Sequence, residues 1–433
     1  MNVNFEALGL KIPEILLPDP AVDLTKWAVV ACDQYTSQPD YWEQAADLIG
    51  SASSTLNLIF PEVYLGKGNE GERIRRIQQK MRECLDTKVL KSQGAGFVLV
   101  RRQTGRGKGR QGLMVALDLE CYDYHKGSQT LIRATEGTVL ERIPPRVRIR
   151  EGAPLELPHI MVLIDDPEKR VIEPIAARVE AGGRGLTKAY DTELMMNSGR
   201  VTGYRVDDPD LNQGIFKGLQ ELADPAQFNQ KYGVTGQPVL LFAMGDGNHS
   251  LATAKAVWEK LKQEYAGSSE LMNHPARYAL VELVNLHDPG LEFEPIHRVV
   301  FQVDLPRLWD EMKAYYNNQG AVMGLEFTKD LNTAREKAVV QSRKGAHLIQ
   351  FVTENGWGLL TVEKSPQILE VGSLQDFLDD YLKRNPQTGI DYIHGDEVVT
   401  ELGRKPGNIG FYLPPMNKSD LFKTVIVNGV LPR

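Results

Sequence analysis

The segment from Pro238 to Lys255 constrains the fold most, because an apolar run ends there in two glycines and a helical pattern begins directly afterwards. Val239 to Ala243 has the length and composition of a buried strand. The apolar residues that follow recur at the spacing of one helical face; they are Leu251, Ala254, Val257, Trp258 and Leu261. The sequence therefore predicts a strand, a tight turn and a helix in succession.

The predicted turn, Gly245 to Ser250, has the features of an anion site. Gly245 and Gly247 allow backbone conformations and close approaches that other residues forbid. The first N–H groups of a helix lack partners within it and lie at the positive end of its dipole, so they suit a phosphate. Asp246 and His249 add a carboxylate and an imidazole, which can bind a metal ion or move a proton. The same residues also suit a plain N-cap in a tight turn, and both interpretations stay open.

The 433-residue chain, with 42% hydrophobic and 25% charged residues, has the composition of a globular protein with two or three domains. Its net charge of -7 disfavours a broad nucleic-acid surface, because phosphate-backbone binding depends on clustered Lys and Arg. Cys32, Cys84 and Cys121 are far apart and form no metal-binding or disulfide pattern. Charged residues interrupt the apolar run of Met1 to Leu17, so we expect no signal peptide there, and no apolar stretch of about 18 residues occurs in the sequence. We expect a cytoplasmic protein that binds neither nucleic acid nor membrane, and the sequence leaves its oligomeric state open.

Alternating helical and strand patterns predict a mixed α/β fold with two domains. Residues 1–303 would form an N-terminal domain that carries the Gly-Asp-Gly-Asn-His motif. Within it, Trp27 to Cys32 is predicted as a buried strand. Residues 304–433 show helix, strand, helix and two further strands, which predicts a second, C-terminal α/β domain.

Arg146, Arg148 and Arg150 are spaced so that a strand would align their guanidinium groups on one face. Such a row suits a polyphosphate or a carboxylate. Pro144 and Pro145 interrupt the preceding segment. Since several glutamates lie nearby, a solvated face of ion pairs is an equal alternative.

Acidic residues follow two of the predicted strands. Asp33 comes after Trp27 to Cys32, and side chains at the carboxyl edge of a sheet commonly face a ligand crevice. Asp165 and Asp166 end the strand His159 to Ile164 and have the chemistry of a Mg²⁺ site beside phosphates. For this pair the favoured interpretation is a turn, because Pro167 follows directly.

A basic run near residue 105 is interrupted by glycines and consists of Arg101, Arg102, Arg106, Lys108 and Arg110. It connects the strand-like segments Phe97 to Val100 and Leu113 to Leu117. The pattern favours an exposed, solvated hairpin loop over a binding surface.

Several of these segments together resemble the domain-of-unknown-function 1015 family over nearly the whole chain. They are Trp27 to Tyr35 (WAVVACDQY), Leu131 to Arg150, Gly245 to His249 with its helix, Glu294 to Arg298 (EPIHR) and Gly429 to Arg433. That family is related to the archaeal free serine kinase and more distantly to ParB and sulfiredoxin. The resemblance implies a ParB/sulfiredoxin-like nucleotide-binding core and a kinase that phosphorylates free serine.

The resemblance also implies residue roles. The run from Asp246 to His249 matches the Asp-Gly-His-His of the kinase, with Asn248 in place of its first histidine. Where the kinase continues with Arg, this chain has Ser250. The missing phosphate-facing cation would have to come from elsewhere, and the candidates are Arg146, Arg148 and Lys255.

We therefore expect a nucleotide-dependent phosphotransferase that acts on a small hydroxylated metabolite, with serine as the first candidate and ATP or ADP with Mg²⁺ as cofactors. Asp33 would accept the hydroxyl proton, Asp246 would hold the metal, and His249 would contact the transferring phosphoryl group. The phosphate-binding residues would be Gly245, Gly247, Asn248, Ser250, Arg146 and Arg148. The alternatives are a nucleotide-binding regulatory module and a nucleotide hydrolase without an amino-acid acceptor.

Overall fold

The computed structural model describes residues 4–36, 38–103, 109–157, 159–293, 295–342 and 346–431. The chain divides into two units, Met1–Leu291 and Glu292–Arg433. Strand β13 (Ile296–Phe301) pairs with β17 (Gly389–His394) and therefore belongs to the sheet of the second unit. Both units mix helices with sheet, as the predicted α/β class requires.

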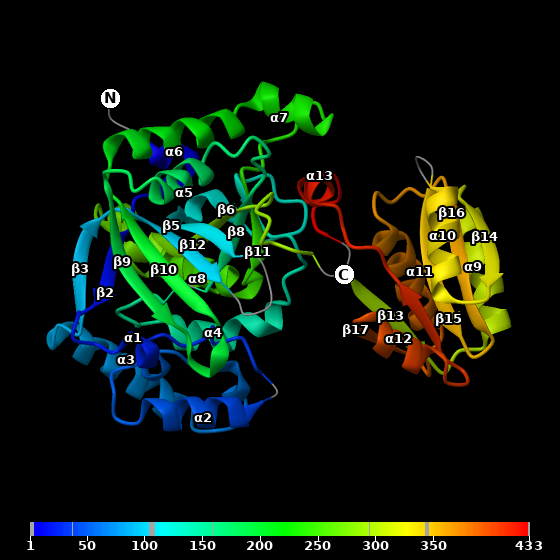
Figure 1. Cartoon of the computed structure of the whole chain (residues 1–433), viewed down its shortest axis with the longest axis horizontal. Helices are drawn as coiled ribbons and strands as arrows, with labels where there is room; N and C mark the ends of the chain where they lie inside the picture. The colour runs from blue at the N-terminus through cyan, green and yellow to red at the C-terminus, as the bar shows by residue number, and fades with distance from the viewer. Residues whose placement is uncertain are drawn as a thin grey trace. The chain divides into compact units, whose positions relative to one another are not determined.

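Ten strands of the first unit, counted over its described residues, form one mixed sheet (Figure 1). Their order across the sheet is β6-β7-β11-β8-β12-β5-β4-β10-β9, and β1 pairs with β5. The bounds are β1 (Leu10–Lys11), β4 (Phe97–Gln103), β5 (Arg110–Asp118), β6 (Tyr122–Asp123), β7 (Ile132–Arg133), β8 (Met161–Ile164), β9 (Leu186–Glu193), β10 (Arg200–Val206), β11 (Phe242–Asp246) and β12 (Tyr278–Asn285). A separate two-stranded sheet pairs β2 (Glu14–Pro18) with β3 (Leu90–Ala95).

One face of the large sheet carries the main core of this unit. Leu113 and Val115 of β5 point to this face and are fully buried. They share the core with apolar residues of α5 (Glu173–Glu180), α6 (Pro209–Leu222) and α8 (Asn248–Glu264). Burying each large apolar side chain contributes about 1.5–3 kcal/mol, so this face holds the helices in place. Helix α7 (Pro225–Tyr232) follows α6.

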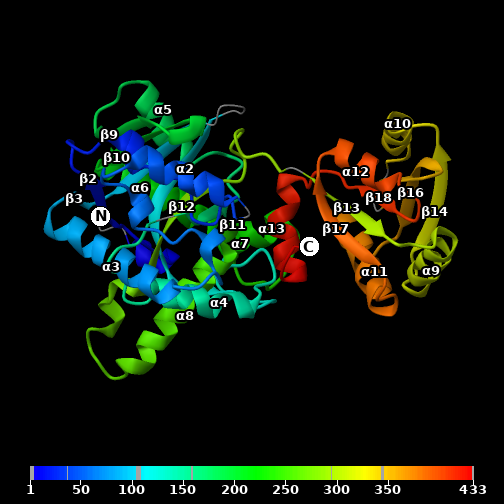
Figure 2. The same cartoon turned by 90° about the horizontal axis from the view of Figure 1, so that it is seen from below.

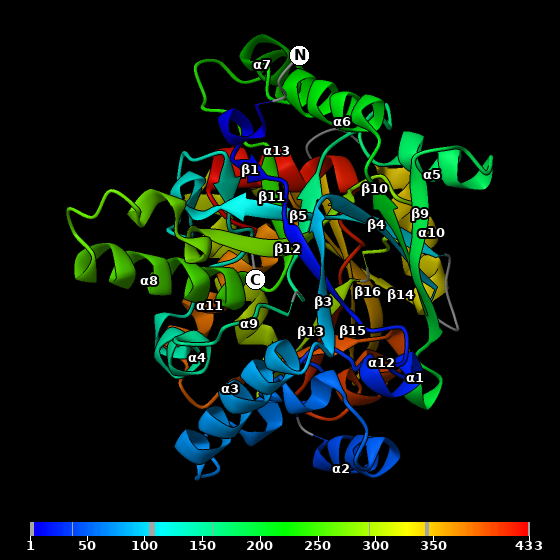
Figure 3. The same ribbon diagram turned by 90° about the vertical axis from the view of Figure 1, so that its left-hand side faces the viewer.

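The other face of the sheet is covered in part by the N-terminal segment. There Ile15 of β2 packs with Val98, Val100 and Met114. The remaining helices of the unit are α1 (Leu24–Trp27), α2 (Pro39–Ile49), α3 (Glu70–Asp86) and α4 (Ile143–Arg150). Helix α4 packs against α8 (Figure 3).

In the second unit, six strands form an antiparallel sheet with the order β14-β16-β15-β18-β13-β17 over the described residues. Helices α9 and α11 cover one face, and α10 and α12 cover the other (Figure 2). Besides β13 and β17, the elements are α9 (Leu305–Asn318), β14 (Val322–Thr328), α10 (Leu331–Gln341), β15 (Ala346–Thr353), β16 (Gly356–Glu363), α11 (Glu370–Arg384), α12 (Asp396–Gly403), β18 (Ile409–Tyr412) and α13 (Lys418–Asn428).

Two predicted strands are wrong. Where a strand from Trp27 to Cys32 is predicted, Trp27 ends the short helix α1 and residues 28–32 form no strand. Asp23 caps this helix by accepting from the Thr25 N–H at 3.0 Å. The segment with the arginine row is helix α4, which begins at Ile143. The first N–H groups of a helix have no partner within it, so a proline in the first turn loses no hydrogen bond, and its φ angle already suits a helix. Pro144 therefore favours the start of α4 and does not interrupt the secondary structure.

In the described part of the chain, no helix is both long enough and apolar enough to cross a lipid bilayer. Cys32, Cys84 and Cys121 are free cysteines, as their spacing predicts. Burial raises the pKa of the Cys32 thiol to about 12, and the adjacent Asp33 adds to the rise. The thiol is therefore protonated at neutral pH and is a poor nucleophile.

Candidate functional site

A pocket of about 200 Å³ opens in the first unit where β11 ends and α8 begins. Four separate parts of the chain meet in it; each carries an acid, and one of them also carries two arginines. The lining residues are Asp33, Glu62, Glu136, Arg142, Arg146, Gly245, Asp246, Gly247, Asn248, His249 and Ser250. The structure thus brings Asp33 and Arg146 to the Gly245–Ser250 turn, although both are at least 99 residues away in sequence.

The turn has the backbone geometry for which glycine is needed. Gly247 has φ +82°, a left-handed conformation, and a Cβ there would lie 3.3 Å from the Cα of Ile160. Asp246 Oδ1 accepts from the Gly247 N–H at 2.7 Å. Helix α8 begins at Asn248, and its N-cap residue is Gly247, which has no side chain to cap the helix. The amide end of a 17-residue helix therefore faces the pocket, where its dipole favours an anion.

The polar side chains of this first turn are held in place by their neighbours. Asn248 is buried, and its Oδ1 accepts from the Thr135 N–H at 3.3 Å. His249 Nε2 accepts from the Val139 N–H at 3.2 Å, so this nitrogen carries no proton in that contact. The Ser250 hydroxyl lies 2.8 Å from Nε2 of His159, which brings a second imidazole to the turn.

Arg142 and Arg146 form the basic wall of the pocket. They lie four residues apart at the start of α4, and side chains at this spacing share a helix face. Arg146 donates to both carboxylate oxygens of Glu62, at 2.8 and 2.6 Å, and also to the Arg142 carbonyl at 2.9 Å. Arg142 is exposed and lines the pocket.

The other two basic candidates lie outside the pocket. Arg148 is exposed and donates to Glu70 at 3.2 Å, on a different side of α4 from Arg146. Lys255 donates to the Leu119 carbonyl at 2.8 Å and pairs with Glu259. The predicted alignment of Arg146 with Arg148 is therefore wrong, because it assumed the period of a strand.

Asp33 and Asp246 form the acidic wall. Both line the pocket, and Asp246 stays exposed to solvent at its opening. The surrounding protein partly removes the Asp246 carboxyl from water, and this burial raises its pKa. The negative charge of Asp33 raises the pKa further. The Gly247 N–H, His159 and Arg110 oppose this effect and favour the ionised form. Two close carboxyls attract a proton or a cation.

These two carboxyls fit the way in which Mg²⁺ binds beside phosphates. Magnesium takes one or two carboxylates and completes its shell with water and substrate oxygens, so it needs no all-protein cage. Among the described residues, no cluster of three or more His, Cys, Asp or Glu side chains could hold a metal alone. Any metal here would therefore depend on the oxygens of a bound ligand.

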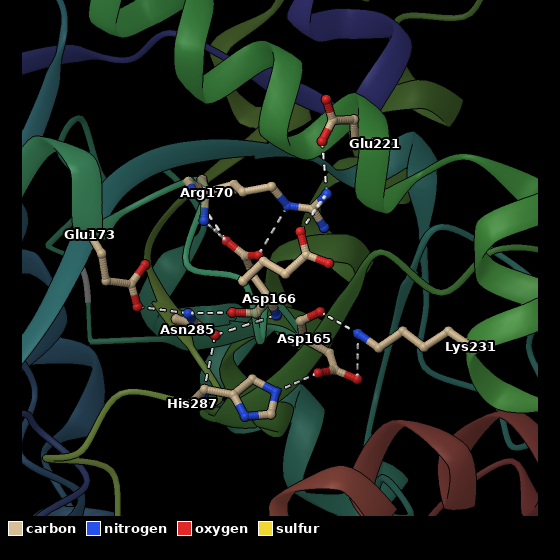
Figure 4. Close-up of polar contacts among 10 residues, drawn as sticks. Asp165, Asp166, Arg170, Glu173, Glu221, Lys231, Asn285 and His287 are labelled. Atoms are coloured by element: carbon tan, nitrogen blue, oxygen red, sulfur yellow. Dashed lines mark hydrogen bonds and ion pairs between the residues drawn. The ribbon is translucent and has the colours of Figure 1, made fainter.

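Asp165 lies at the opposite edge of the sheet. Strand β8 begins beside Asp246 and ends before Asp165, so the length of the strand separates the two. Asp165 is 5% exposed and accepts from Tyr232 at 2.6 Å. It also accepts from His287 at 2.7 Å and from Lys231 at 2.9 Å (Figure 4). Its oxygens are thus engaged by three side chains of the protein.

Asp166 is also engaged, by the backbone of the turn that follows it. Its Oδ2 accepts from the N–H groups of Arg170 at 2.5 Å and Val171 at 3.0 Å. Asn285 donates to the Asp166 carbonyl at 2.8 Å and to Glu173 at 2.7 Å (Figure 4). These contacts agree with the turn that Pro167 predicts, and in them the Asp166 side chain stabilises the backbone of that turn.

The basic run forms the predicted hairpin, because β4 and β5 pair from Val98↔Met114 to Arg102↔Arg110. Arg106 and Lys108 lie outside the described residues. Arg102 and Arg110 are half-buried strand residues, so the prediction of a fully solvated loop is wrong for them. Burial lowers the pKa of Arg102, and the charge of Arg110 lowers it further.

Three residues of the pocket were not assigned to the site from the sequence. These are Glu62, Glu136 and Arg142. Arg142 had a usable signal, since its distance of four from Arg146 places both on one helix face once Pro144 is taken as a helix start. For Glu62 and Glu136 the sequence holds no local signal, because only the tertiary fold brings them near Gly247.

The fold and the pocket define a mixed α/β protein with acidic and basic groups around a strand-to-helix turn. The chain belongs to the family described as "Protein of unknown function (DUF1015)", whose family model matches residues 16–381. The solved structure of a conserved hypothetical protein from Pyrococcus furiosus is similar at 13% identity and a TM-score of 0.28, covering 49% of this chain and 79% of the other. The chain has no match among the curated proteins.

Proposed function

We propose that the first unit is a phosphotransferase that uses a nucleotide, ATP or ADP, to phosphorylate the hydroxyl group of a small metabolite, with free serine as the first candidate. One observation carries the proposal: the amide end of α8, which begins after a glycine in the left-handed conformation, shares one pocket with Asp33, Asp246 and two arginines. The resemblance of this family to the free serine kinase agrees with it. We also propose that the protein acts in the cytoplasm.

The amide end of α8 and Arg142 are suited to the phosphates of the nucleotide. A helix N-terminus offers N–H groups and a positive potential, and glycine at position 247 lets a ligand approach the backbone. Arg142 adds a full positive charge from the neighbouring wall. Arg146, paired with Glu62, acts mainly by holding α4 and thus Arg142 at the pocket.

Asp33 is the best candidate for the general base. It lines the pocket with Asp246 and interacts with it electrostatically. The other carboxylate beside Arg146, Glu62, already accepts a hydrogen bond from it at each oxygen. In the proposed reaction, the acceptor oxygen forms a bond to phosphorus while the bond to the leaving nucleotide oxygen breaks. The hydroxyl proton passes to Asp33, and the nucleotide leaves with one phosphate fewer.

Asp246 would hold Mg²⁺ together with phosphate oxygens. The metal would neutralise charge on the phosphates. His249 is fixed by the Val139 N–H and so keeps one orientation beside the phosphoryl position.

The proposal is tested by incubating the purified chain with ATP or ADP, Mg²⁺ and a panel of hydroxylated amino acids and small metabolites. Formation of a phosphorylated acceptor supports it. Asp33→Asn should lower kcat by about 100-fold or more while nucleotide affinity stays within about twofold. An exposed acid outside the pocket, Asp40, provides the control variant Asp40→Asn, which should leave both quantities unchanged.

The two alternatives give different products in the same assay. A nucleotide hydrolase would release free phosphate without a phosphorylated acceptor, and a regulatory module would bind nucleotide without any product. Absence of nucleotide binding would exclude all three activities for this pocket.

A further inference from the structure

Ser250 and His159 form a hydroxyl–imidazole pair at the edge of the pocket. The Ser250 Oγ lies 2.8 Å from Nε2 of His159. Ser250 lines the pocket, and among the described residues that do so it alone carries a hydroxyl group. Both side chains are half-buried, so the pair is partly shielded from water while Ser250 still faces the pocket. A hydroxyl group therefore lies where the proposed reaction transfers a phosphoryl group.

The sheet determines the position of this imidazole. Strand β8 runs antiparallel to β11, and Met161 lies opposite Asp246 at the end of their pairing. The residues before Met161 therefore follow the turn that leads into α8, where a Cβ on Gly247 would lie 3.3 Å from the Cα of Ile160. The charge of His159 favours the ionised form of Asp246, so the imidazole lies near the acidic wall as well as near the start of α8.

Two threonine hydroxyls near the turn have a different environment. Thr135 donates to the Met244 carbonyl at 2.8 Å, and Thr253 donates to the His249 carbonyl at 2.7 Å. A backbone carbonyl fixes such a hydroxyl but does not act as a base. A neutral imidazole has one ring nitrogen that accepts a proton, and with the proton on Nδ1 the Ser250 hydroxyl donates to Nε2. A serine hydroxyl becomes a nucleophile when a base lies within hydrogen-bond reach, as it does here.

The surroundings of Ser250 also suit a phosphate attached to its hydroxyl. Ser250 is the third residue of α8. A phosphate in the first turn of a helix can accept from the free N–H groups and lies at the positive end of the dipole. Arg142 lines the same pocket and adds a positive charge. The phosphorylated product would therefore be stabilised where it forms.

We propose that Ser250 is a self-phosphorylation site of this chain and that His159 is the base that activates it. When no acceptor is bound, the Ser250 Oγ forms a bond to the terminal phosphorus while the bond to the leaving nucleotide oxygen breaks. The hydroxyl proton passes to Nε2 of His159, and the nucleotide leaves with one phosphate fewer. This inference rests on the proposed phosphotransferase function and adds a covalent modification of the protein to it.

Phosphorylation of Ser250 inhibits the pocket. A phosphoserine carries about 1.5 to 2 negative charges at neutral pH. On Ser250 this group occupies the amide end of α8, which the phosphates of an incoming nucleotide would need, and like charges placed together oppose binding. We expect the phosphorylated chain to bind ATP at least about tenfold more weakly than the unmodified chain.

The test incubates the full, unaltered chain with ATP or ADP and Mg²⁺, without and with the panel of hydroxylated acceptors. Mass spectrometry of the digested chain locates the phosphate. We expect it on Ser250, with less incorporation when an acceptor competes for the phosphoryl group. Because Ser250 lies in the pocket of its own molecule, the rate per molecule should stay constant when the protein is diluted.

Two pairs of variants assign the reaction to its residues, and thermal denaturation checks that each variant is folded. Ser250→Ala removes the hydroxyl and should abolish incorporation, whereas Ser269→Ala removes an exposed hydroxyl outside the pocket and should have no effect. His159→Gln removes the base and should slow incorporation by about 100-fold or more. His125→Gln is its control, because His125 is exposed and pairs with Asp123.

Three results would overturn the inference and leave the proposed function intact: a chain that phosphorylates an acceptor but not Ser250, equal rates of incorporation in His159→Gln and His125→Gln, or a rate per molecule that rises with protein concentration. Unchanged ATP affinity of the phosphorylated chain would overturn the inhibition. If neither Ser250 nor any acceptor is phosphorylated, the proposed function itself fails.

Discussion

Arg146 donates two hydrogen bonds to the carboxylate of Glu62, at 2.8 and 2.6 Å, and this pair ties α4 to the short helical turn Glu62–Tyr64. Both side chains are less than one fifth exposed. A two-pronged pair of this kind sets an orientation as well as a distance. It explains how an arginine from a distant part of the chain is aligned with the strand-to-helix turn at Gly247.

Breaking this pair should loosen the pocket. We expect Glu62→Gln to lower the free energy of unfolding by about 1–3 kcal/mol, because Arg146 would lose a charged partner in a mostly buried place. Thermal and urea denaturation measure this change. Arg148→Gln removes only the more exposed pair with Glu70 and should change stability by no more than about 0.5 kcal/mol. Equal effects of the two variants would contradict the role given to Arg146 and Glu62.

The same helix supplies a matched pair for phosphate binding. Arg142, the N-cap residue of α4, lines the pocket and Arg148, inside the helix, does not, although both are exposed. Arg142→Gln should weaken nucleotide binding by about tenfold, and the loss should shrink at high salt because it is electrostatic. Arg148→Gln should bind nucleotide as the unaltered chain does. Titration of ATP at two ionic strengths checks both statements.

Gly247→Ala should impair the turn in two ways. The residue has φ +82°, which costs a non-glycine residue about 1–2 kcal/mol, and its new Cβ would press on Ile160. Gly236→Ala is the control, because Gly236 has φ +68° with no atom near the added Cβ. We expect both variants to lose stability, the first more than the second, and only Gly247→Ala to lose nucleotide affinity. Intact affinity in Gly247→Ala would argue against phosphate contact at this backbone.

The raised pKa of Asp246 predicts a pH-dependent effect on stability. A carboxyl whose pKa is higher in the folded protein opposes folding once it is ionised, so its cost grows as the pH rises above 3.8 through the raised value. Asp246→Asn mimics the protonated form. It should therefore raise the thermal midpoint at pH 7, with a gain that disappears as the pH falls toward 3.8, while phosphotransferase activity is lost. A gain that increases at low pH would contradict this sign.

In contrast to Asp246→Asn, the variant Asp165→Asn should lower the stability of the protein and leave nucleotide binding unchanged. This variant leaves Lys231 and His287 beside an uncharged partner, and loss of one member of a buried ionic network costs about 3–5 kcal/mol. Nucleotide affinity of the folded fraction should stay unchanged, because Asp165 lies across the sheet from the pocket. A loss of affinity with normal stability would make Asp165 part of a binding site.

Local sequence patterns predicted much of the second unit and the hairpin of the first. In the second unit, α9, β14, α10, β15 and β16 follow the predicted order of helix, strand, helix and two further strands, because the apolar periodicity there is clear. The segment 143–150 was predicted wrongly because arginines at every second position look like a strand face. Two prolines at a helix start were the better signal.

The strand-to-helix turn at Gly245–Ser250 could be read from the chain alone, because glycine conformations and apolar spacing act over a few residues. Membership of the family could be recognised in the same way. The other residues that line the pocket around this turn could not be predicted from the sequence. The pocket also includes Asp33, Glu62 and Arg142, which lie on loops and helix ends far apart in the sequence. Their positions depend on packing between distant segments, and such packing produces no local sequence pattern from which the contact could be predicted.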